Sequence, residues 1–447
     1  MNMRAQLETQ LNDFNPATRQ AALQTLLQMV EDGDLSLPEP GRFFNLHCHS
    51  FFSYNGYGYS PTALAWKGRC EGLCAMGLVD FDVLDGVDEF LAACRAAGLR
   101  ACAGIETRIF VPEFATRVIN SPGEPGISYH MGVGFVTGAA HEAHLLREFK
   151  AVAQARNRNM VARINPHLAP VMLDYDADVL PLTPKGNPTE RHVCMAYDAK
   201  AKALFPEPEA RAAFWAEKLG VELPVVRDSL ENPAVFQGII RAKTMKSGGV
   251  GYVQPEGPDF PRLEQLNQFS LANGAIPTMA WLDGTTPGEE ALDELLDVMI
   301  RSGIAAVNII PDRNWNIKNP DERKRKVQAL HDFVRVAAGR FLPVFVGTEM
   351  NAPGQRFVDD FDAPELAPLY PAFLEGAHIA HAHTLLQAHA GMGYLSEWAT
   401  ANFASTGEKN EFYAEVGRRF IHTQSGAFLT VNPSRTRAEI ERSLGLS

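Results

Sequence analysis

The sequence predicts an α/β fold in which about seven or eight strands alternate with helices. Three observations support this prediction and outline how the fold is organised. Short apolar runs recur along the chain, separated by longer segments with helical periodicity. The alternation is interrupted once, by a long middle part rich in proline, asparagine and charge. Polar residues of catalytic type follow several strands. The strand number favours a barrel over an open sheet, and either architecture places its chemistry at the carboxyl ends of the strands.

The first part of the chain predicts two short helices and then a regular alternation. Asn15-Pro16 fits an N-cap and first-turn pair for the second helix, and Pro38-Glu39-Pro40-Gly41 ends the segment. The residues that follow predict strands at 43–49, 76–80 and 99–105, with helices at 61–74 and 87–97 between them. This order implies parallel strands connected by crossover helices.

The rest of the chain predicts an irregular part and a second alternation. Residues 115–245 contain one expected strand at 133–136, helices near 140–158 and 208–219, and a loop at 181–188. Strands are then expected at 250–253, 276–281, 305–310 and 342–347, with helices near 260–273, 287–302 and 320–339. A last strand is expected at 378–381, followed by helical segments.

These elements predict four parts. A helical extension covers 1–40, the barrel takes 41–144 and 246–400, an inserted segment covers 145–245, and a second helical extension covers 401–447. The insertion could close over a site as a cap or mediate a homo-oligomer.

Composition narrows the classes of function. Among 447 residues, 41 are Lys or Arg and 53 are Asp or Glu, a formal net charge of -12. That balance argues against a nucleic-acid surface but permits a small phosphorylated substrate, which a few local cations can bind. Six cysteines lack a paired framework, which indicates reduced, buried thiols. No signal peptide pattern and no apolar run of the ~18–20 residues that span a membrane is evident, so we expect a cytoplasmic protein without a membrane partner.

His47 and His49 are the most informative pair in the sequence. They end the first predicted strand, and residues i and i+2 of a strand point to the same face, so the two imidazoles could share a metal ion. A chance His-X-His at a loop entrance is the alternative. Glu106 ends the third predicted strand, where a strand-end ion pair is the alternative to a metal ligand.

The run from Leu46 to Ile109 resembles the PHP family, the polymerase and histidinol phosphatase domains. The family's His-X-His-Ser motif is matched by His47-Cys48-His49-Ser50, and its Gly-Ile-Glu motif by Gly104-Ile105-Glu106. Its Thr-Asp-His-Asp motif is replaced by Val79-Asp80-Phe81-Asp82. A late Gly-Ser-Asp-X-His motif is echoed more loosely by Gly347-Thr348-Glu349-Met350-Asn351.

The resemblance implies a distorted seven-stranded barrel that binds up to three divalent metal ions and cleaves phosphoesters. For the first metal it implies four ligands: His47, His49, Glu106 and Glu349. For the second it implies Glu106 as a bridge and His130, with Gln254 in place of a further histidine. The third position is lost, since Asn55, Phe81 and Asn351 stand where Asp or His is expected. We therefore expect one metal ion (Mn, Zn or Fe), leave a second open, and expect no third.

Further residues are candidates for catalysis and substrate binding. Asp80 or Asp82 could orient a histidine ligand or accept a proton, although Asp82 could equally be a helix N-cap. Phosphate or carboxylate recognition needs cations, and Arg313, Arg191 and Lys185 are candidates that could instead form ordinary ion pairs. The remaining predicted substrate-binding residues are Gln254, Asn351 and His383.

Other histidines are weaker candidates. His381 and His383 have strand-like spacing, but such residues more often pack at a barrel rim. His167 could supply the missing second-metal ligand if the insertion folds inward.

The sequence leaves three functions open. The leading one is a metal-dependent hydrolase, a phosphoesterase acting on a small soluble anionic metabolite through a metal-activated water. The second is a metal-dependent isomerase, epimerase or lyase acting on a sugar-acid-like substrate, because one metal suffices to polarise a carbonyl. The third is a non-catalytic scaffold, and the joint presence of His47, His49 and Glu106 speaks against it.

Overall fold

A seven-stranded, nearly closed barrel forms the centre of the computed structural model, which describes the chain except residues 1–2, 422–427, 429 and 447. Its strands are adjacent in chain order: β1 Phe44–Cys48, β2 Ala75–Phe81, β3 Arg100–Phe110, β4 Ile127–Val133, β5 Ile276–Trp281, β6 Ala306–Ile309 and β7 Val344–Val346. All neighbours are parallel except β4, which is antiparallel to both β3 and β5. The predicted distorted α/β barrel is confirmed.

Backbone hydrogen bonds just beyond β7 join the two ends of the sheet. The Glu349 N–H donates to the His47 carbonyl at 2.8 Å, and the His49 N–H donates to the Glu349 carbonyl at 2.8 Å. The ends of β1 and β7 are therefore adjacent, and the residues that follow β7 lie beside the two histidines.

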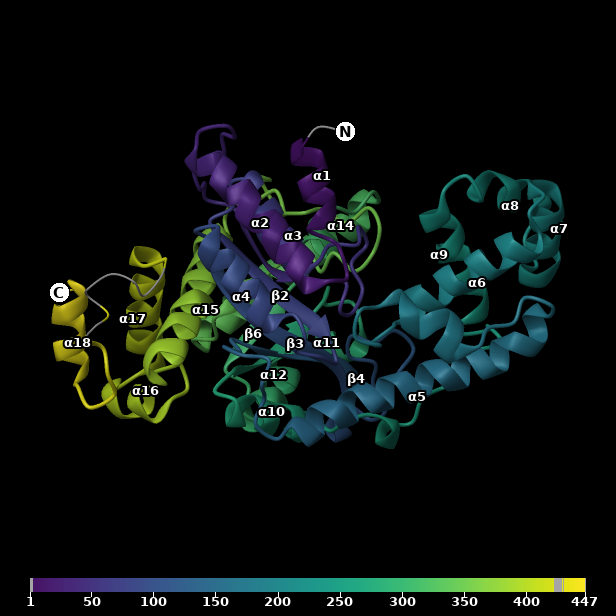
Figure 1. Cartoon of the computed structure of the whole chain (residues 1–447). Coiled ribbons are helices and arrows are strands. Elements are labelled where there is room, and N and C mark those ends of the chain that lie inside the picture. The colour runs from purple at the N-terminus through teal and green to yellow at the C-terminus, as the bar shows by residue number, and fades with distance from the viewer. Residues whose placement is uncertain (1–2, 422–427, 429, 447) are drawn as a thin grey trace.

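Helices cover the outside of the barrel and bury its outward-facing apolar residues (Figure 1). In chain order the main ones are α3 Pro61–Cys70, α4 Val87–Ala96, α10 Leu263–Ala272, α12 Leu292–Arg301, α14 Pro320–Gly339 and α15 Tyr370–Ala390. Shorter turns, α11 Pro287–Glu290 and α13 Asp312–Trp315, follow β5 and β6. Trp281 of β5 stacks on Phe333 of α14, with 4.4 Å between ring centroids, which illustrates how this layer packs.

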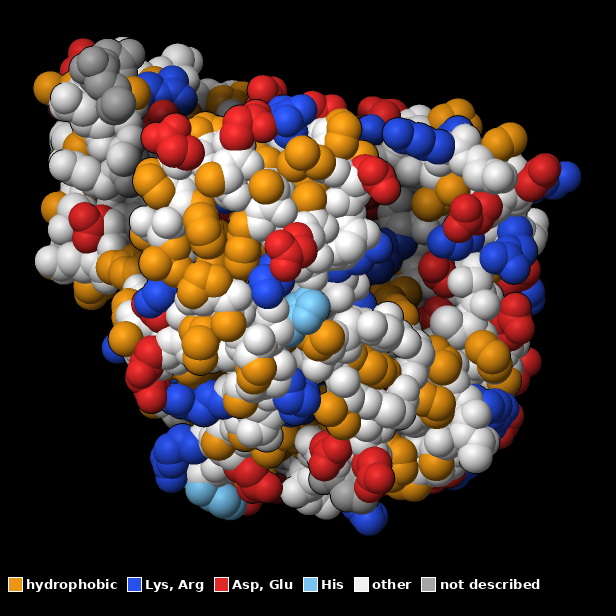
Figure 2. Space-filling model, turned by 90° about the vertical axis from the view of Figure 1, so that its right-hand side faces the viewer, with side chains coloured by type: hydrophobic (Ala, Val, Ile, Leu, Met, Phe, Trp, Pro, Cys, Tyr) orange, Lys and Arg blue, Asp and Glu red, His pale blue; other side chains and the backbone are white. Residues whose placement is uncertain are grey.

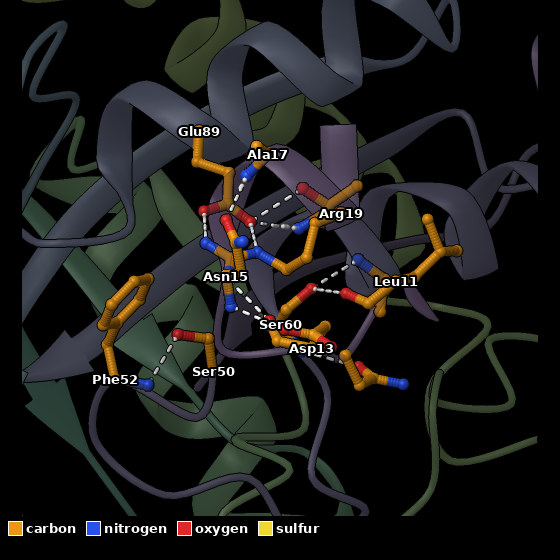
Figure 3. A network of polar contacts seen from close by, with 12 residues as sticks. Leu11, Asp13, Asn15, Ala17, Arg19, Ser50, Phe52, Ser60 and Glu89 are labelled. Carbon is orange, nitrogen blue, oxygen red and sulfur yellow. Dashed lines mark hydrogen bonds and ion pairs between the residues drawn. The ribbon is translucent and has the colours of Figure 1, made fainter. Parts of the chain in front are cut away.

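The two N-terminal helices, α1 Met3–Gln10 and α2 Pro16–Glu31, are fixed to the barrel by a network of polar contacts (Figure 3). Asn15 caps α2 by accepting a hydrogen bond from the Ala17 N–H at 3.0 Å. The Arg19 guanidinium donates to both carboxylate oxygens of Glu89 on α4, and Glu89 also accepts the Thr62 hydroxyl at 2.7 Å. The Arg19 side chain is 3% exposed, so this ion pair lies inside the contact between the helices.

The inserted segment has an apolar core of its own. It contains α5 Ala143–Leu168, a π-helical turn η2 Tyr175–Val179, a 3-10 turn η3 Leu180–Leu182, α6 Glu190–Leu204, α7 Pro208–Leu219, α8 Leu223–Ser229 and α9 Pro233–Thr244. Trp215 and Tyr197 are fully buried in this core. In Figure 1 α6–α9 lie to the right of the barrel, at the end of the long helix α5. The Asn187 amide donates to the carbonyls of Phe52 and Phe81, which ties the insertion to the loop after β1 and to the end of β2.

The C-terminal part is helical and lies on the opposite side of the barrel from the insertion (Figure 1). It contains α16 Glu397–Asn402, α17 Thr406–Arg419 and α18 Arg437–Leu444. Within the described residues, no helix is both long enough and apolar enough to span a bilayer.

Three predicted strands differ from the structure. Residues 250–253 form no strand, and Val250 and Val253 are exposed. Residues 378–381 lie inside α15, whose apolar residues surround the helix, so a short window of it resembles a buried strand. The strand expected at 133–136 overlaps β4 only at Val133, because β4 runs Ile127–Val133 and is antiparallel to its neighbours. The parallel order inferred for the first three strands is confirmed.

Candidate metal centre

Three buried side chains converge inside the barrel. His47 and His49 come from the end of β1 and Glu106 from β3, and they are 1%, 0% and 2% exposed. The two Nε2 atoms are 3.3 Å apart, and Glu106 Oε2 lies 3.3 Å from the Nε2 of His47 and 3.2 Å from that of His49. Among the described residues, this is the group of His, Cys, Asp or Glu side chains arranged to hold a metal ion. The expectation that His47 and His49 share a face is confirmed by this geometry.

The other ring nitrogens of the histidines are held by oxygen atoms. His47 Nδ1 lies 2.9 Å from Asn308 Oδ1, an acceptor, so the Nδ1 carries the proton. His49 Nδ1 lies 3.2 Å from the Ser53 hydroxyl, which donates to Asp80 Oδ1 at 2.6 Å. With Nδ1 protonated, each Nε2 directs a lone pair inward, as a metal-binding histidine does.

Glu106 Oε2 is buried and has no hydrogen-bond partner among the described residues. Burial alone would raise the pKa of Glu106, but the adjacent His47 and His49 lower it to about 2, so the carboxylate is charged. Burial opposes charge on His47, yet Glu106 raises the pKa of His47 above its ordinary value. Two imidazole nitrogens and a carboxylate oxygen that face one point fit a divalent cation such as zinc, manganese or iron.

Glu349 is close to this group but is engaged elsewhere. One Arg313 nitrogen lies 3.1 Å and 2.9 Å from the two carboxylate oxygens of Glu349, and the Gln355 amide donates to Oε2 at 3.1 Å. Glu349 and Met350 have φ of +62° and +57°, an uncommon conformation for residues with a side chain. The structure therefore places the predicted ligand Glu349 beside the centre, in an ion pair with the predicted substrate residue Arg313.

The residues implied for a second and a third metal are not gathered at this centre. His130 lies on the opposite face of β4 from the centre: it pairs with Thr107, the neighbour of Glu106, and its Nε2 lies 2.7 Å from Asn267 Oδ1 on α10. Burial lowers the pKa of His130 to about 4. Gln254 binds the carbonyl of Gly123 instead of joining the group. The structure thus does not support His130 and Gln254 as ligands beside Glu106.

The residues at the lost third position have packing roles or stand apart. The Phe81 ring stacks on His49, with centroids 4.1 Å apart. The Asn55 amide donates to the His49 carbonyl at 2.8 Å, which fixes the loop after β1. Asn351 is partly exposed, two residues beyond Glu349.

The two aspartates after β2 lie behind the metal ligands. Asp80 accepts the Ser50 N–H, the Ser50 hydroxyl and the Ser53 hydroxyl, so it positions His49 through Ser53. Burial raises the pKa of Asp80 and that of Asp82. Asp82 has φ of +62° and accepts a hydrogen bond from the Thr107 hydroxyl. The N-cap of α4 is Gly86, so the alternative role of Asp82 as a helix cap is not observed.

The other predicted polar residues are scattered. Arg191 lies in the first turn of α6 in the insertion, and Lys185 is exposed in the preceding loop. His383 is buried in α15, where its Nε2 lies 3.0 Å from the Gly134 carbonyl and its Nδ1 accepts the Tyr394 N–H, so it packs the far side of the barrel. His381 is likewise held by the backbone of Ala101. The exposed His167 binds the carbonyl of Lys218 on α7 and does not reach the centre.

Sequence reasoning missed Tyr129, which faces the centre from β4. It pairs directly with Arg108, and directly paired residues share a face of the sheet. Glu106 and Met131 form the pair two positions along the strands, so they lie on the same face as Arg108 and Tyr129. Its ring centroid lies 6.3 Å from that of Phe81. Burial raises the pKa of Tyr129, with Arg108 acting in the opposite direction, so the phenol keeps its proton. Correct bounds for β4 would have revealed it.

No protein-family model and no curated protein sequence matches the chain. Two solved structures are similar in outline. One, from Bifidobacterium adolescentis, is provisionally described as a metal-dependent phosphoesterase; it is 18% identical, with 75% of this chain and 98% of that chain covered and a TM-score of 0.45. The other is an amidohydrolase from Chromobacterium violaceum with bound sulfate and no metal; it is 17% identical, with 74% and 96% covered and a TM-score of 0.46. Likenesses this low do not define the chemistry of this chain.

Proposed function

We propose that this chain is a metal-dependent hydrolase that cleaves a phosphoester of a small soluble metabolite. The observation that carries the proposal is the convergence of two histidine Nε2 atoms and Glu106 Oε2 on one buried point, where Oε2 has no hydrogen-bond partner among the described residues. Three protein ligands would leave coordination positions open, as catalytic sites do and closed structural sites do not. The motifs shared with PHP domains favour the same chemistry.

A divalent metal bound there would act as a Lewis acid and lower the pKa of a bound water toward 7. The protein supplies the surroundings. Asn308 and Ser53 hold the two imidazoles in the tautomer that binds a metal. Arg313, whose side chain is 43% exposed, lies beside the centre and can exchange its Glu349 partner for an anionic substrate oxygen.

Tyr129 fits the role of a hydrogen-bond donor to the substrate. Its hydroxyl forms no hydrogen bond with any residue that the structure describes, and its ring lies on the inner face of β4 near Glu106. A protonated phenol beside a phosphoester can donate to an oxygen on which charge develops.

The proposal is tested by metal content and activity in parallel. We expect purified wild-type protein to contain about one equivalent of Zn, Mn or Fe by elemental analysis, and a His47→Ala/His49→Ala variant to contain none. His167→Ala is the matched control, because it removes an exposed histidine remote from the centre. Activity is measured on a panel of phosphomonoesters and phosphodiesters with each metal added. Metal-free wild-type protein that also takes up no added ion would refute the proposal.

A single metal also suits the second candidate, an isomerase, epimerase or lyase acting on a sugar-acid-like substrate. The observation in its favour is that His130 and Gln254 do not join the centre, so the described residues offer one metal position. Tight metal binding without turnover of any phosphoester, together with turnover of sugar acids, would favour this candidate over the phosphoesterase.

A further inference from the structure

Five basic side chains gather where the inserted helices face the barrel. They come from separate segments, β3, α5, α6, α9 and the turn after α9, and are Arg108, Arg156, Arg191, Arg241 and Lys246. We propose that this basic cluster binds a second acidic group of the substrate, a phosphate or a carboxylate, while another group of the same molecule reacts at the metal. The proposal rests on the proposed function and names its substrate class, a small metabolite with two acidic groups.

Two carboxylates engage three of the five cations. Arg108 Nη1 lies 2.8 Å from Glu124 Oε2. Arg241 Nε and Lys246 Nζ both bind Glu190 Oε2, at 2.8 Å and 2.7 Å. Each of these pairs is at least partly shielded from water, since the Glu124 and Glu190 side chains are 12% and 23% exposed. The Asp82 carboxylate also interacts electrostatically with Arg156. Among the described residues, three carboxylates thus face five cations, which leaves an excess of positive charge.

Arg156 and Arg191 carry that excess. Within the described part of the chain, neither guanidinium forms a hydrogen bond or an ion pair, and Arg156 Nη1 is buried without a partner. Arg156 lies over the Phe260 ring at 4.4 Å, and Arg108 lies over the same ring at 5.1 Å. Two guanidinium groups on one ring repel each other, and a buried donor without an acceptor is costly. A bound anion would relieve both.

The electrostatics agree with this geometry. Burial, with the repulsion from Arg108 next, lowers the pKa of Arg156 to about 10. Burial and then Arg241 lower the pKa of Arg191. An anion among these side chains would offset both effects. The ion pairs of Glu190 with Arg241 and Lys246 join α6 to α9 and to the turn after it, so they leave Arg156 and Arg191 without an ion-paired carboxylate among the described residues.

The distance to the metal centre suits one small molecule. Arg108 and Glu106 are two residues apart on the same face of β3, which corresponds to about 7 Å along a strand. Tyr129 lies opposite Arg108 and interacts electrostatically with both Glu106 and Arg241. Figure 2 shows that the face of the molecule on the side of the insertion is hollowed, with Lys and Arg side chains inside the hollow. A metabolite with acidic groups a few bonds apart could reach both sites.

The test measures anion binding in metal-free protein by titration calorimetry, with inorganic phosphate and malonate as probes at constant ionic strength. We expect wild-type protein to bind at least one of them, and an Arg156→Met/Arg191→Met variant to bind it about 10-fold more weakly or worse. Preference for phosphate or for malonate identifies the second acidic group as a phosphate or a carboxylate. Arg158→Met is the matched control, because Arg158 lies on α5 but pairs with Asp176 at the surface.

The metal ligands separate this proposal from the proposed function. His47→Ala/His49→Ala protein should keep its anion affinity, since the basic cluster does not use these residues. Binding by the Arg156/Arg191 variant at wild-type strength, or no binding of either probe by wild-type protein, would overturn the second site even if the metal is bound. Anion binding without any metal uptake would keep the site and refute the hydrolase. Unfolding curves for each variant confirm that it folds.

Discussion

Replacing Asn308 by leucine tests whether the surroundings of His47 determine metal affinity. Asn308 and His47 are each 1% exposed, and Asn308 Oδ1 lies 2.9 Å from His47 Nδ1. Leucine has a similar volume but no acceptor. Without that acceptor, no hydrogen bond favours the imidazole proton on Nδ1. The proton can move to Nε2, which lies 3.3 Å from Glu106 Oε2. A proton at that position occupies the lone pair that would bind the metal.

The expected loss is about 10-fold to 100-fold in metal affinity, the range seen when a partner of a metal-binding histidine is removed. That corresponds to about 1.4–2.8 kcal/mol. The Asn308 amide nitrogen has no hydrogen-bond partner among the described residues, so its removal adds no further cost. The affinity of metal-free protein for Zn²⁺ is measured by competition with a chromophoric chelator.

Asn308→Asp is the control, since it keeps an acceptor at the same place. We expect it to bind Zn²⁺ at least as tightly as wild type, because a carboxylate holds the Nδ1 proton more strongly. Leucine and aspartate variants of equal affinity would refute the reasoning. So would a leucine variant within twofold of wild type.

Three further predictions concern pH, the N-terminal helices and the insertion. Without metal, the depressed pKa of Glu106 stabilises the fold above about pH 4.5, and this stabilisation is lost as the pH falls toward 2. The raised pKa of His47 stabilises the fold below about pH 6.5, and that stabilisation is lost as the pH rises through the pKa that His47 has in the folded protein. Metal binding needs both groups deprotonated, so the rise in Tm that Zn²⁺ produces should grow from pH 5.5 to pH 8, and a constant rise would contradict this. Arg19→Met should lower the free energy of unfolding by about 2 kcal/mol in urea titrations. This loss is smaller than that expected from breaking a fully buried ion pair, because Glu89 is 21% exposed. An unchanged urea midpoint would show that the polar network does not hold the N-terminal helices on the barrel. Trp215→Ala should destabilise the insertion by about 3–5 kcal/mol in denaturant unfolding but leave metal content unchanged, and loss of metal would show that the two cores depend on each other.

The part of the site that could be predicted depended on local rules. His47 and His49 are two residues apart, so the strand itself brings them together wherever the strand lies. Predicting that Glu106 lies near them required one further rule, that adjacent parallel strands end at the same edge of a sheet. The strands β1, β2 and β3 follow this rule. These inferences needed no knowledge of distant contacts.

Predictions that depended on distant contacts were less successful. Glu349 has the right position beside His47 but also an arginine within reach, and nothing in its own sequence neighbourhood shows that Arg313 engages it. The strand expected at 378–381 failed because a helix buried on all sides and a buried strand present the same apolar composition over a few residues. Only the packing of the whole barrel distinguishes the two.

The error at β4 has the widest consequence for function. Adjacent residues of a strand face opposite sides, so the pairing of Thr107 with His130 and of Arg108 with Tyr129 means that only one of His130 and Tyr129 can face Glu106. A histidine there would have favoured a second metal bridged by Glu106. The register selects the phenol and the guanidinium instead, groups that bind a substrate and not a cation. The same register that turns His130 away from Glu106 places Arg108 where the barrel meets the insertion. The proposed single metal and the proposed acidic substrate therefore depend on one structural feature.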